Sequence, residues 1–243
     1  MDVIARYLAV VRGQLEEAMG GQREALDRAA GWVADALVGG RWLYAAGTGH
    51  SHLLALELFY RAGGLVRAVP MLDEDLMLHR SASESSGHER ETGRASALIE
   101  RYGVGAGDVM LVISNSGRNA VPVELAMLGK ERGARVVALT SLRHARAHAS
   151  RHASGKRLLD VADVVLDNAG VEGDAAVEVA PGLSMGATST VVGAAMIQGL
   201  VAEAAARAMA RSWKPEVYRS SNGAGESENA RYLAEWVGRM PHL

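Results

Sequence analysis

Residues 109–119 read VMLVISNSGRN, and this stretch decides the fold. Its first half, Val109 to Ile113, is an unbroken apolar run, typical of a strand that is covered on both faces of a parallel sheet. Its second half brings two serines, two asparagines and a glycine to the start of a helical pattern at 119–132. The stretch therefore indicates a strand that passes through a polar loop into a helix.

The same alternation of short apolar runs and helical patterns continues on both sides of this stretch. Two helical patterns open the chain, at about 2–19 and 22–38. We expect the other strands at 42–46, 65–69, 136–139 and 164–166, and the other helices at about 50–62, 94–102, 187–211 and 227–238. Such a series favours an α/β fold built on a parallel sheet.

The length of 243 residues suits one α/β domain with a helical extension. We expect an N-terminal helical segment (1–40), a central domain (41–211) and a C-terminal loop and helix (212–243). Hydrophobic residues make up 49% of the chain, charged residues 22%, and the net charge is -2, as in ordinary soluble globular proteins.

The chain contains no cysteine, which excludes disulfides, zinc–thiolate sites, iron–sulfur clusters and cysteine nucleophiles. The first twenty residues lack a long apolar stretch, so we expect no secretory signal and a cytoplasmic location. The long uncharged run from Val179 to Ala202 is interrupted by Pro181, Gly182 and Gly186, and we interpret it as a buried helix and not as a membrane span.

Three polar loops follow predicted strands. The loop 114–119 (the serine loop) offers hydroxyls, amides and a helix N-terminus, which together favour a bound phosphate; simple N-capping of the helix is the alternative. The loop 47–51 (the first loop) reads GTGHS, and Thr140 and Ser141 end a third strand. Because the carboxyl ends of parallel strands meet at one edge of a sheet, we expect these loops to share one crevice.

Nucleotide-binding motifs fit less well. His52 stands where the G-x-G-x-x-G pattern requires its third glycine. Gly155-Lys156 is followed by Arg157 and lacks the upstream glycine of a phosphate-binding P-loop. We therefore expect no nucleotide cofactor.

Taken together, Gly47 to Ser51, Ile113 to Gly117 and Ala138 to Ser141 resemble the sugar isomerase (SIS) domain superfamily, over roughly residues 30–205. The likeness is greatest to a bacterial family of stand-alone proteins with a single SIS domain, on the segments FYRAGG (59–64), LMLH (76–79), and SRH (150–152) with SGK (154–156).

The resemblance implies a five-stranded parallel sheet flanked by helices, a flavodoxin-like three-layer sandwich with an N-terminal helical extension. It also implies a homodimer with sites near the subunit interface, and a small-molecule ligand that is a hexose or aminosugar 6-phosphate. By the same likeness Ser114, Ser116 and Gly117 hold the phosphate, and Asn119 stands where many members have threonine. The complete expected substrate-binding set is Gly47, Thr48, Gly49, His50, Ser51, Ser114, Asn115, Ser116, Gly117, Asn119, Thr140 and Ser141.

Reactions on such sugars begin with removal of the proton next to the carbonyl, which needs a carboxylate or an imidazole. Glu57 lies among apolar residues of a predicted helix, where a carboxylate is costly unless it is functional or paired, here with Arg61 one turn on. SIS enzymes that resemble etherases or isomerases place an acidic residue before the serine-loop strand, and Glu89 is our choice there. We expect His79 as general acid and His50 as a sugar-hydroxyl contact, with structural roles for both as the alternative.

His144, His148 and His152 recur at every fourth residue and would share one face of a continuous helix, as metal ligands do. The neighbouring Arg143, Arg146 and Arg151 would repel a cation, so we expect no metal site; with Lys156 they are better suited to an anionic ligand or a carboxylate.

Two classes of function remain. The first is an enzyme that abstracts the C2 proton and then either eliminates the C3 substituent or isomerises the sugar; Ser116-Gly117-Arg118 is similar to the loop of N-acetylmuramic acid 6-phosphate etherases and favours elimination. The second is a non-catalytic sugar-phosphate sensor. Residues 1–40 carry four arginines and no lysine against six acidic residues, so we expect no nucleic-acid partner.

Overall fold

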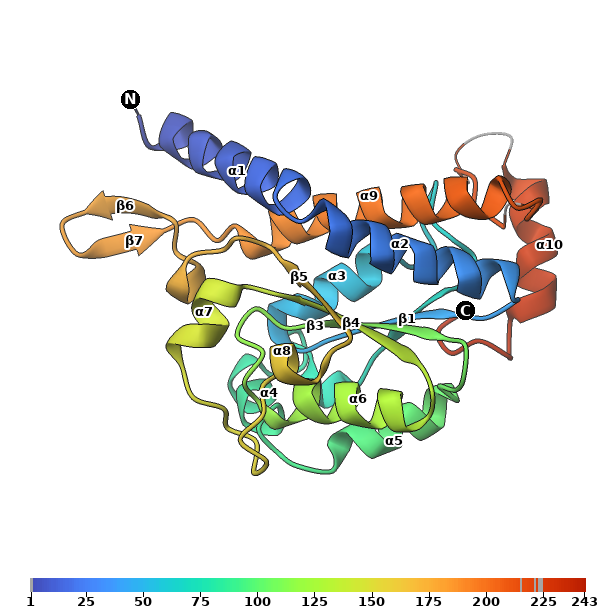
Figure 1. Cartoon of the computed structure of the whole chain (residues 1–243), viewed down its shortest axis with the longest axis horizontal. Coiled ribbons are helices and arrows are strands. Elements are labelled where there is room, and N and C mark those ends of the chain that lie inside the picture. Colours follow the sequence, from blue (N-terminus) through green and yellow to red (C-terminus); the bar gives the residue numbers. More distant parts are fainter. Residues whose placement is uncertain (1, 215, 221, 223–224) are drawn as a thin grey trace.

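The computed structural model describes residues 2–214, 216–220, 222 and 225–243 and contains a five-stranded parallel sheet (Figure 1). The strand order is β2-β1-β3-β4-β5. The strands are Leu43–Gly47 (β1), Ala68–Met71 (β2), Val109–Ile113 (β3), Arg135–Thr140 (β4) and Val164–Asp167 (β5). This confirms the predicted α/β fold, and the run that opened the sequence analysis is the central strand.

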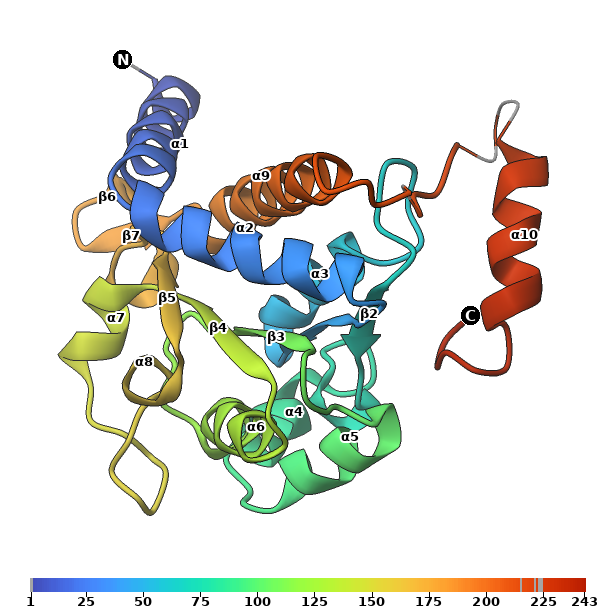
Figure 2. The same cartoon turned by 45° about the vertical axis from the view of Figure 1, so that its right-hand side comes forward.

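Helices cover both faces of the sheet (Figures 1 and 2). Above it in Figure 1 lie Val3–Gly20 (α1), Arg23–Val38 (α2), His52–Glu57 (α3) and Ser189–Met209 (α9). Below it lie Ala82–His88 (α4), Arg94–Tyr102 (α5), Ala120–Glu131 (α6) and Leu158–Val161 (α8). The predicted bounds of α1, α2, α5 and α6 agree with these to within one residue.

The two layers bury alternate residues of the same strands, because successive side chains of a strand point to opposite faces. In β3, Leu111 and Ile113 pack into the cluster that contains the buried faces of α2 and α9. Met110 and Val112 pack into the other cluster, with residues of α5 and α6. An apolar residue is therefore needed at every position of this strand.

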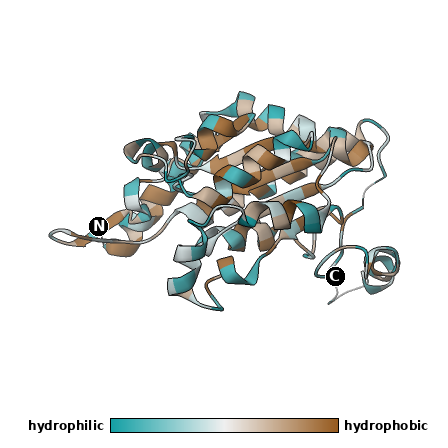
Figure 3. Ribbon diagram, turned by 90° about the horizontal axis from the view of Figure 1, so that it is seen from below, coloured by the Kyte–Doolittle hydropathy of each residue, from teal (hydrophilic) through white to brown (hydrophobic). Residues whose placement is uncertain are grey.

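Helix α9 is long and apolar enough to span a membrane by length and composition alone. Its side chains Met196, Ile197 and Leu200 are nevertheless buried in the cluster beneath α2. Figure 3 shows the hydrophobic parts of the ribbon gathered in the sheet and the helices against it. This is the packing of a core helix.

Three elements differ from the prediction by more than two residues. The second strand is Ala68–Met71 and not 65–69, because Leu65 pairs instead with Val217 near the C-terminus. The helix expected at 50–62 is a 3-10 turn, Gly49–Ser51, followed by α3, which ends at Glu57.

The third difference lies at the start of the run from Val179 to Ala202. Its first residues belong to an antiparallel hairpin, Val177–Ala180 (β6) and Leu183–Met185 (β7), and only the part from Ser189 is helical. Pro181 and Gly182 form the turn, where Gly182 has a φ of 75°. The hairpin extends beside α1 (Figures 1 and 2), and the Tyr7 hydroxyl donates to the carbonyl of Ala187 at 2.8 Å.

The C-terminal helix, Glu226–Trp236 (α10), returns to the β2 end of the sheet. Trp236 packs edge-on against Trp42, with 4.8 Å between ring centroids. The Arg67 guanidinium lies 5.0 Å from one ring and 5.1 Å from the other. Cation–π attraction thus helps to attach α10 to the domain.

The strand order also indicates where a ligand would bind. From β1 the chain moves outward to β2, and it then returns to β3 on the other side of β1. In open α/β sheets ligands bind where the order reverses in this way, beyond the carboxyl ends of the strands. Here those ends carry the first loop, after β1, and the serine loop, after β3.

Candidate functional site

The serine loop is shaped by its own first hydroxyl. Ser114 is buried, and its Oγ accepts a hydrogen bond from the backbone N–H of Gly117 at 3.1 Å. Gly117 has a φ of 58°, and a Cβ there would come within 3.3 Å of both Leu158 and Thr140. A glycine is thus favoured at this turn. Ser116 is only half-buried, so its hydroxyl is the more accessible of the two.

Thr140 and Ser141 support the serine loop from the side of β4. The Thr140 hydroxyl donates to the carbonyl of Asn115 at 3.2 Å, and the Ser141 hydroxyl donates to the carbonyl of Gly170 at 2.7 Å. The Asn168 amide donates to the Asn115 Oδ1 at 2.9 Å. With 1% and 0% of their surfaces exposed, Thr140 and Ser141 are placed to position the loop from behind.

The first loop depends on Gly47. A Cβ at this position would lie 2.5 Å from the backbone carbonyl of Ser51, closer than a side chain can approach. Thr48 is 6% exposed, whereas His50 is exposed on the 3-10 turn. The imidazole of the buried His52 forms a short hydrogen bond with the carbonyl of Gly49 and so anchors the turn.

Glu89 joins the two loops. It follows α4, and its Oε1 accepts a hydrogen bond from the Thr48 hydroxyl at 2.7 Å. Its backbone carbonyl accepts from the N–H of Val121, in the first turn of α6, at 3.2 Å. The carboxylate is thus fixed between the first loop and the helix that begins at the serine loop.

Glu57 and His79 lie elsewhere. Glu57 is the last residue of α3; it forms a short ion pair with Arg61 and accepts from the Gln198 amide at 3.2 Å. This is the pairing that sequence analysis gave as the alternative to a functional role. His79 is exposed and lines a groove of about 600 Å³ beyond β2, and its ring centroid lies 6.1 Å from that of His52.

Two arginines belong to the serine loop's surroundings. Arg151 was expected from the sequence to approach an anionic ligand or a carboxylate, whereas Arg118 was noted only for the likeness of its loop to that of the etherases. The carbonyl of Arg118 accepts from the N–H of Arg151 at 2.8 Å, and the Arg151 Nη1 donates to the Asn119 Oδ1 at 3.1 Å. Asn119 therefore binds an arginine and does not cap α6. Burial, and then the charges of Arg118 and Arg90, lower the pKa of Arg151, while Glu89 opposes this shift. The signal in the sequence was the arginine after Ser116-Gly117.

The spaced histidines do not share a helix. Helix Leu142–Ala147 (α7) ends before His148, so the helical spacing assumed for them does not apply. The His144 Nδ1 accepts from the N–H of Gly173 at 2.8 Å, and burial, followed by the charge of His148, lowers its pKa. His148 and His152 lie 3.0 and 3.6 Å from separate carboxylates. Within the described residues, no three His, Asp or Glu side chains are grouped as metal ligands.

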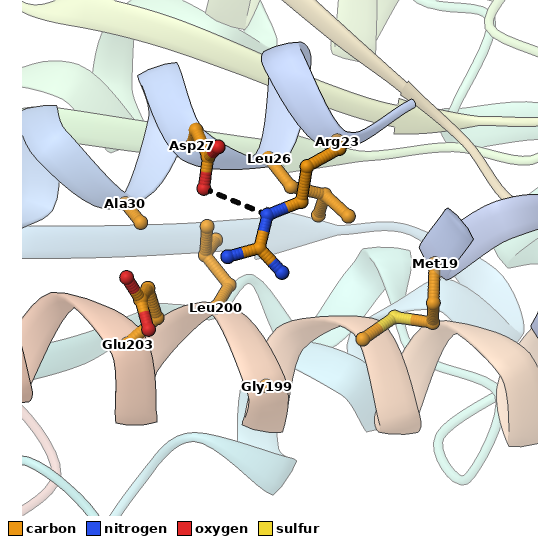
Figure 4. A pocket seen from close by; sticks show the side chains of 8 residues that line it. All are labelled: Met19, Arg23, Leu26, Asp27, Ala30, Gly199, Leu200 and Glu203. Atoms are coloured by element: carbon orange, nitrogen blue, oxygen red, sulfur yellow. Dashed lines mark hydrogen bonds and ion pairs between the residues drawn. The ribbon is translucent and has the colours of Figure 1, made fainter. Parts of the chain in front are cut away.

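Figure 4 shows a separate hollow between α2 and α9, lined by residues of both helices and by Met19. The Arg23 guanidinium lies 3.1 Å from Asp27 across its rim. Its volume of about 120 Å³ is below the roughly 300 Å³ that ligand pockets usually reach. The candidate site is therefore placed at the reversal of strand order, where the first loop and the serine loop lie.

Residues 6–141 match the model of a family described as the SIS domain. The UPF0309 protein of Listeria innocua is 38% identical over 243 residues, covering 99% of this chain and 98% of that protein. A phosphoheptose isomerase from Francisella tularensis superposes with a TM-score of 0.52 at 14% identity, covering 83% of this chain and 95% of the other. The Vibrio vulnificus NanR protein complexed with ManNAc-6P superposes with a TM-score of 0.51 at 18% identity, covering 96% and 69%. At these identities the two structures show a likeness of fold.

Proposed function

The chain belongs to the SIS-domain family, within the UPF0309 group, and on this premise we propose that it is a sugar-phosphate enzyme. Its proposed substrate is an N-acetylaminosugar 6-phosphate or a related hexose 6-phosphate. The observation that carries the proposal is the Glu89 carboxylate, hydrogen-bonded to Thr48 between the two loops at the reversal of strand order.

The proposed phosphate position is the serine loop. The N-terminus of α6 carries a partial positive charge that favours an anion, and Ser116 adds a hydroxyl donor. Its half-buried side chain leaves it accessible to a ligand. We keep the remaining residues of the predicted binding set, from Gly47 to Ser141, as proposed contacts or supports of this ligand.

Glu89 is the proposed general base. A phosphate on the serine loop would leave the sugar extending toward the first loop, where Glu89 is fixed by both its side chain and its carbonyl. The carboxylate takes the C2 proton of the open-chain sugar, and the Thr48 hydroxyl orients it. Glu57, whose contacts are with Arg61 and Gln198, is the second choice. His79 remains the proposed general acid, although it lies beyond β2; its ring centroid is 6.1 Å from that of His52, which anchors the turn of the first loop.

Elimination of the C3 substituent is the proposed outcome, on the likeness of Ser116-Gly117-Arg118 to the etherase loop. Isomerisation shares the first step, but the enolate is then reprotonated at C1 instead of expelling the C3 substituent. The ligand named for the NanR structure, ManNAc-6P, supports the choice of an N-acetylaminosugar 6-phosphate.

The test is to incubate the protein with a panel of hexose and aminosugar 6-phosphates in deuterated water and follow the products by NMR. We expect loss of the C2 proton together with the C3 substituent, which leaves a C2–C3 double bond. Deuterium at C1 and a ketose would indicate the isomerase. Binding without any conversion or exchange would contradict an enzyme and favour a sensor. The variant Ser116→Asp, which places a negative charge at the phosphate position, should abolish binding without unfolding the protein.

We further propose that the protein acts as a homodimer in the cytoplasm, with its sites near the interface. Ile4 and Leu8 on α1, with 81% and 45% of their surfaces exposed, lie on the same projecting part of the fold as Leu183 and Met185 of the hairpin, at 54% and 58%. A second copy would remove this apolar surface from water. Light scattering that gives a monomer at micromolar concentration would contradict the dimer.

A further inference from the structure

Three guanidinium groups surround the serine loop without ion-pair partners. In the part of the chain that the structure describes, Arg90, Arg118 and Arg151 make no ion pair with a carboxylate. The neighbouring Arg157, by contrast, pairs with Asp160 at 3.1 Å. The site therefore carries positive charges that the protein itself does not neutralise in pairs.

Backbone contacts hold Arg151 in this position. Its N–H donates to the carbonyl of Arg118 at 2.8 Å, and farther on the N–H of Leu158 donates to the carbonyl of Gly117 at 2.7 Å. The residues between these bonds are thus attached to the serine loop at both ends. The Arg151 side chain then reaches Asn119, at the start of α6.

Arg118 provides a second, independent observation. Its Nε atom is buried, and no described group accepts a hydrogen bond from it. A buried donor without an acceptor is costly and is rare in folded proteins. An anion in contact with the Arg118 guanidinium would remove part of this cost by lowering the electrostatic energy of the group.

The charges also indicate what the anion is. The arginines repel one another, as the lowered pKa of Arg151 reflects, with burial as the first cause and Arg118 and Arg90 as the next. Glu89 opposes this effect. Three guanidinium groups set against this carboxylate leave an excess of positive charge, which favours a multiply charged anion such as a phosphate group.

We propose that Arg118 and Arg151, assisted by Arg90, bind the phosphate of the substrate as a dianion and so make the protein selective for phosphate esters over unphosphorylated sugars. This deepens the proposed function, on which its sugar part rests. Guanidinium groups suit the role because they donate two parallel hydrogen bonds to phosphate oxygens. The serine loop fixes the position of the phosphate, and the arginines supply the charge.

The test is calorimetry with inorganic phosphate and with glucose 6-phosphate, on the full chain, at pH 7.5 and pH 5.0. Arg118→Gln and Arg151→Gln should each weaken the binding of both probes by about 10- to 100-fold at pH 7.5, the loss expected for a charge-assisted hydrogen bond. At pH 5.0 phosphate is a monoanion, so the same substitutions should matter less. Arg151→Lys should restore part of the affinity.

Arg132→Gln is the matched control, because Arg132 is an exposed cation at the end of α6 opposite to the serine loop. The control variant should bind both probes with the affinity of the wild type. Phosphate should raise the melting temperature of the wild type and of the control, but not of Arg118→Gln or Arg151→Gln. Equal losses of phosphate affinity in all three variants would mean that the arginines act only through the overall positive charge of the protein, and this would overturn the proposal. So would unchanged phosphate affinity in Arg118→Gln and Arg151→Gln.

This experiment tests the arginine site independently of whether the protein is an enzyme. If the two variants lose phosphate while no sugar in the panel is converted, the arginine site stands and the enzyme does not. If sugars are converted equally well by the wild type and both variants, the enzyme stands and the arginine site is refuted.

Discussion

Removing the Thr48 hydroxyl should disable the proposed base without touching the proposed phosphate position. Thr48→Val keeps the size and branching of the side chain but deletes the donor that lies 2.7 Å from the Glu89 Oε1. Glu89 would keep its backbone bond to Val121, so the change is confined to the orientation of the carboxylate. Thr48→Ser retains the hydroxyl and serves as the control.

The size of the effect follows from the kind of bond that is lost. A hydrogen bond to a charged group contributes about 1.5–3 kcal/mol, and each 1.36 kcal/mol of barrier is a tenfold change in rate. Thr48 is 6% exposed, so water cannot readily replace its hydroxyl. We therefore expect Thr48→Val to reduce kcat by roughly 10- to 100-fold with little change in KM, and Thr48→Ser to stay near the wild type.

A double-mutant cycle with Glu89→Gln makes the test specific. Glu89→Gln alone should reduce kcat by about 10²- to 10⁴-fold, as expected for a lost general base. If Thr48 acts by orienting Glu89, Thr48→Val should add less than about twofold in the Glu89→Gln background. The same cycle applied to urea unfolding reports the coupling in the absence of substrate.

Independent effects of the two substitutions would refute this reasoning. If Thr48→Val reduces kcat by the same factor with and without the Glu89 carboxylate, Thr48 acts on the substrate directly. Full activity of Glu89→Gln would remove the base itself and direct attention to His79 or to another acidic residue of the segment 73–94.

Other consequences can be measured separately. Gly47→Ala should destabilise the protein by about 1–3 kcal/mol in urea unfolding, because its Cβ would overlap backbone atoms, whereas Gly13→Ala in α1, with no neighbouring atom within 4 Å, should stabilise it by up to about 1 kcal/mol. Burial, and then the charge of His148, lowers the pKa of His144, so the folded state favours the neutral ring. The contribution of His144 to stability should therefore be complete above about pH 7. It should fall as the pH drops through about 6.5, the unfolded-state pKa, toward the folded-state pKa. His144→Gln should reduce that fall. A chelator should leave turnover unchanged, and borohydride should trap no lysine imine.

Much of the fold could be predicted from local sequence alone. The apolar run from Val109 to Ile113 became a strand at the same residues, because every one of its side chains is buried by one layer of helices or the other. The helix 94–102 was also predicted at its observed bounds, where Gly103 ends it with a φ of 66°. Periodicity and glycine placement are local properties, and they were sufficient here.

Local patterns misplaced the strands that pair or pack with a segment far away in the sequence. Leu65 has the residue type of a strand, but its pairing with Val217 moves the start of β2 to Ala68. Residues 177–185 form a hairpin whose neighbour is α1, more than 150 residues away in sequence. No local signal describes such pairings.

The candidate site also has parts that local sequence predicts and parts that depend on distant contacts. The sequence determined the serine loop and the first loop, because the shapes of these loops depend on local contacts. Gly47 leaves room for the backbone of Ser51, and the Ser114 hydroxyl binds the N–H of Gly117. Only the tertiary structure decided between the carboxylates: it places Glu89 on Thr48, forty-one residues away, and pairs Glu57 with Arg61 in its own helix. It also gathered the arginines around the serine loop. The reason is that a charged side chain takes its role from the charges and donors that the folded chain brings within a few ångströms of it, and those are set by topology.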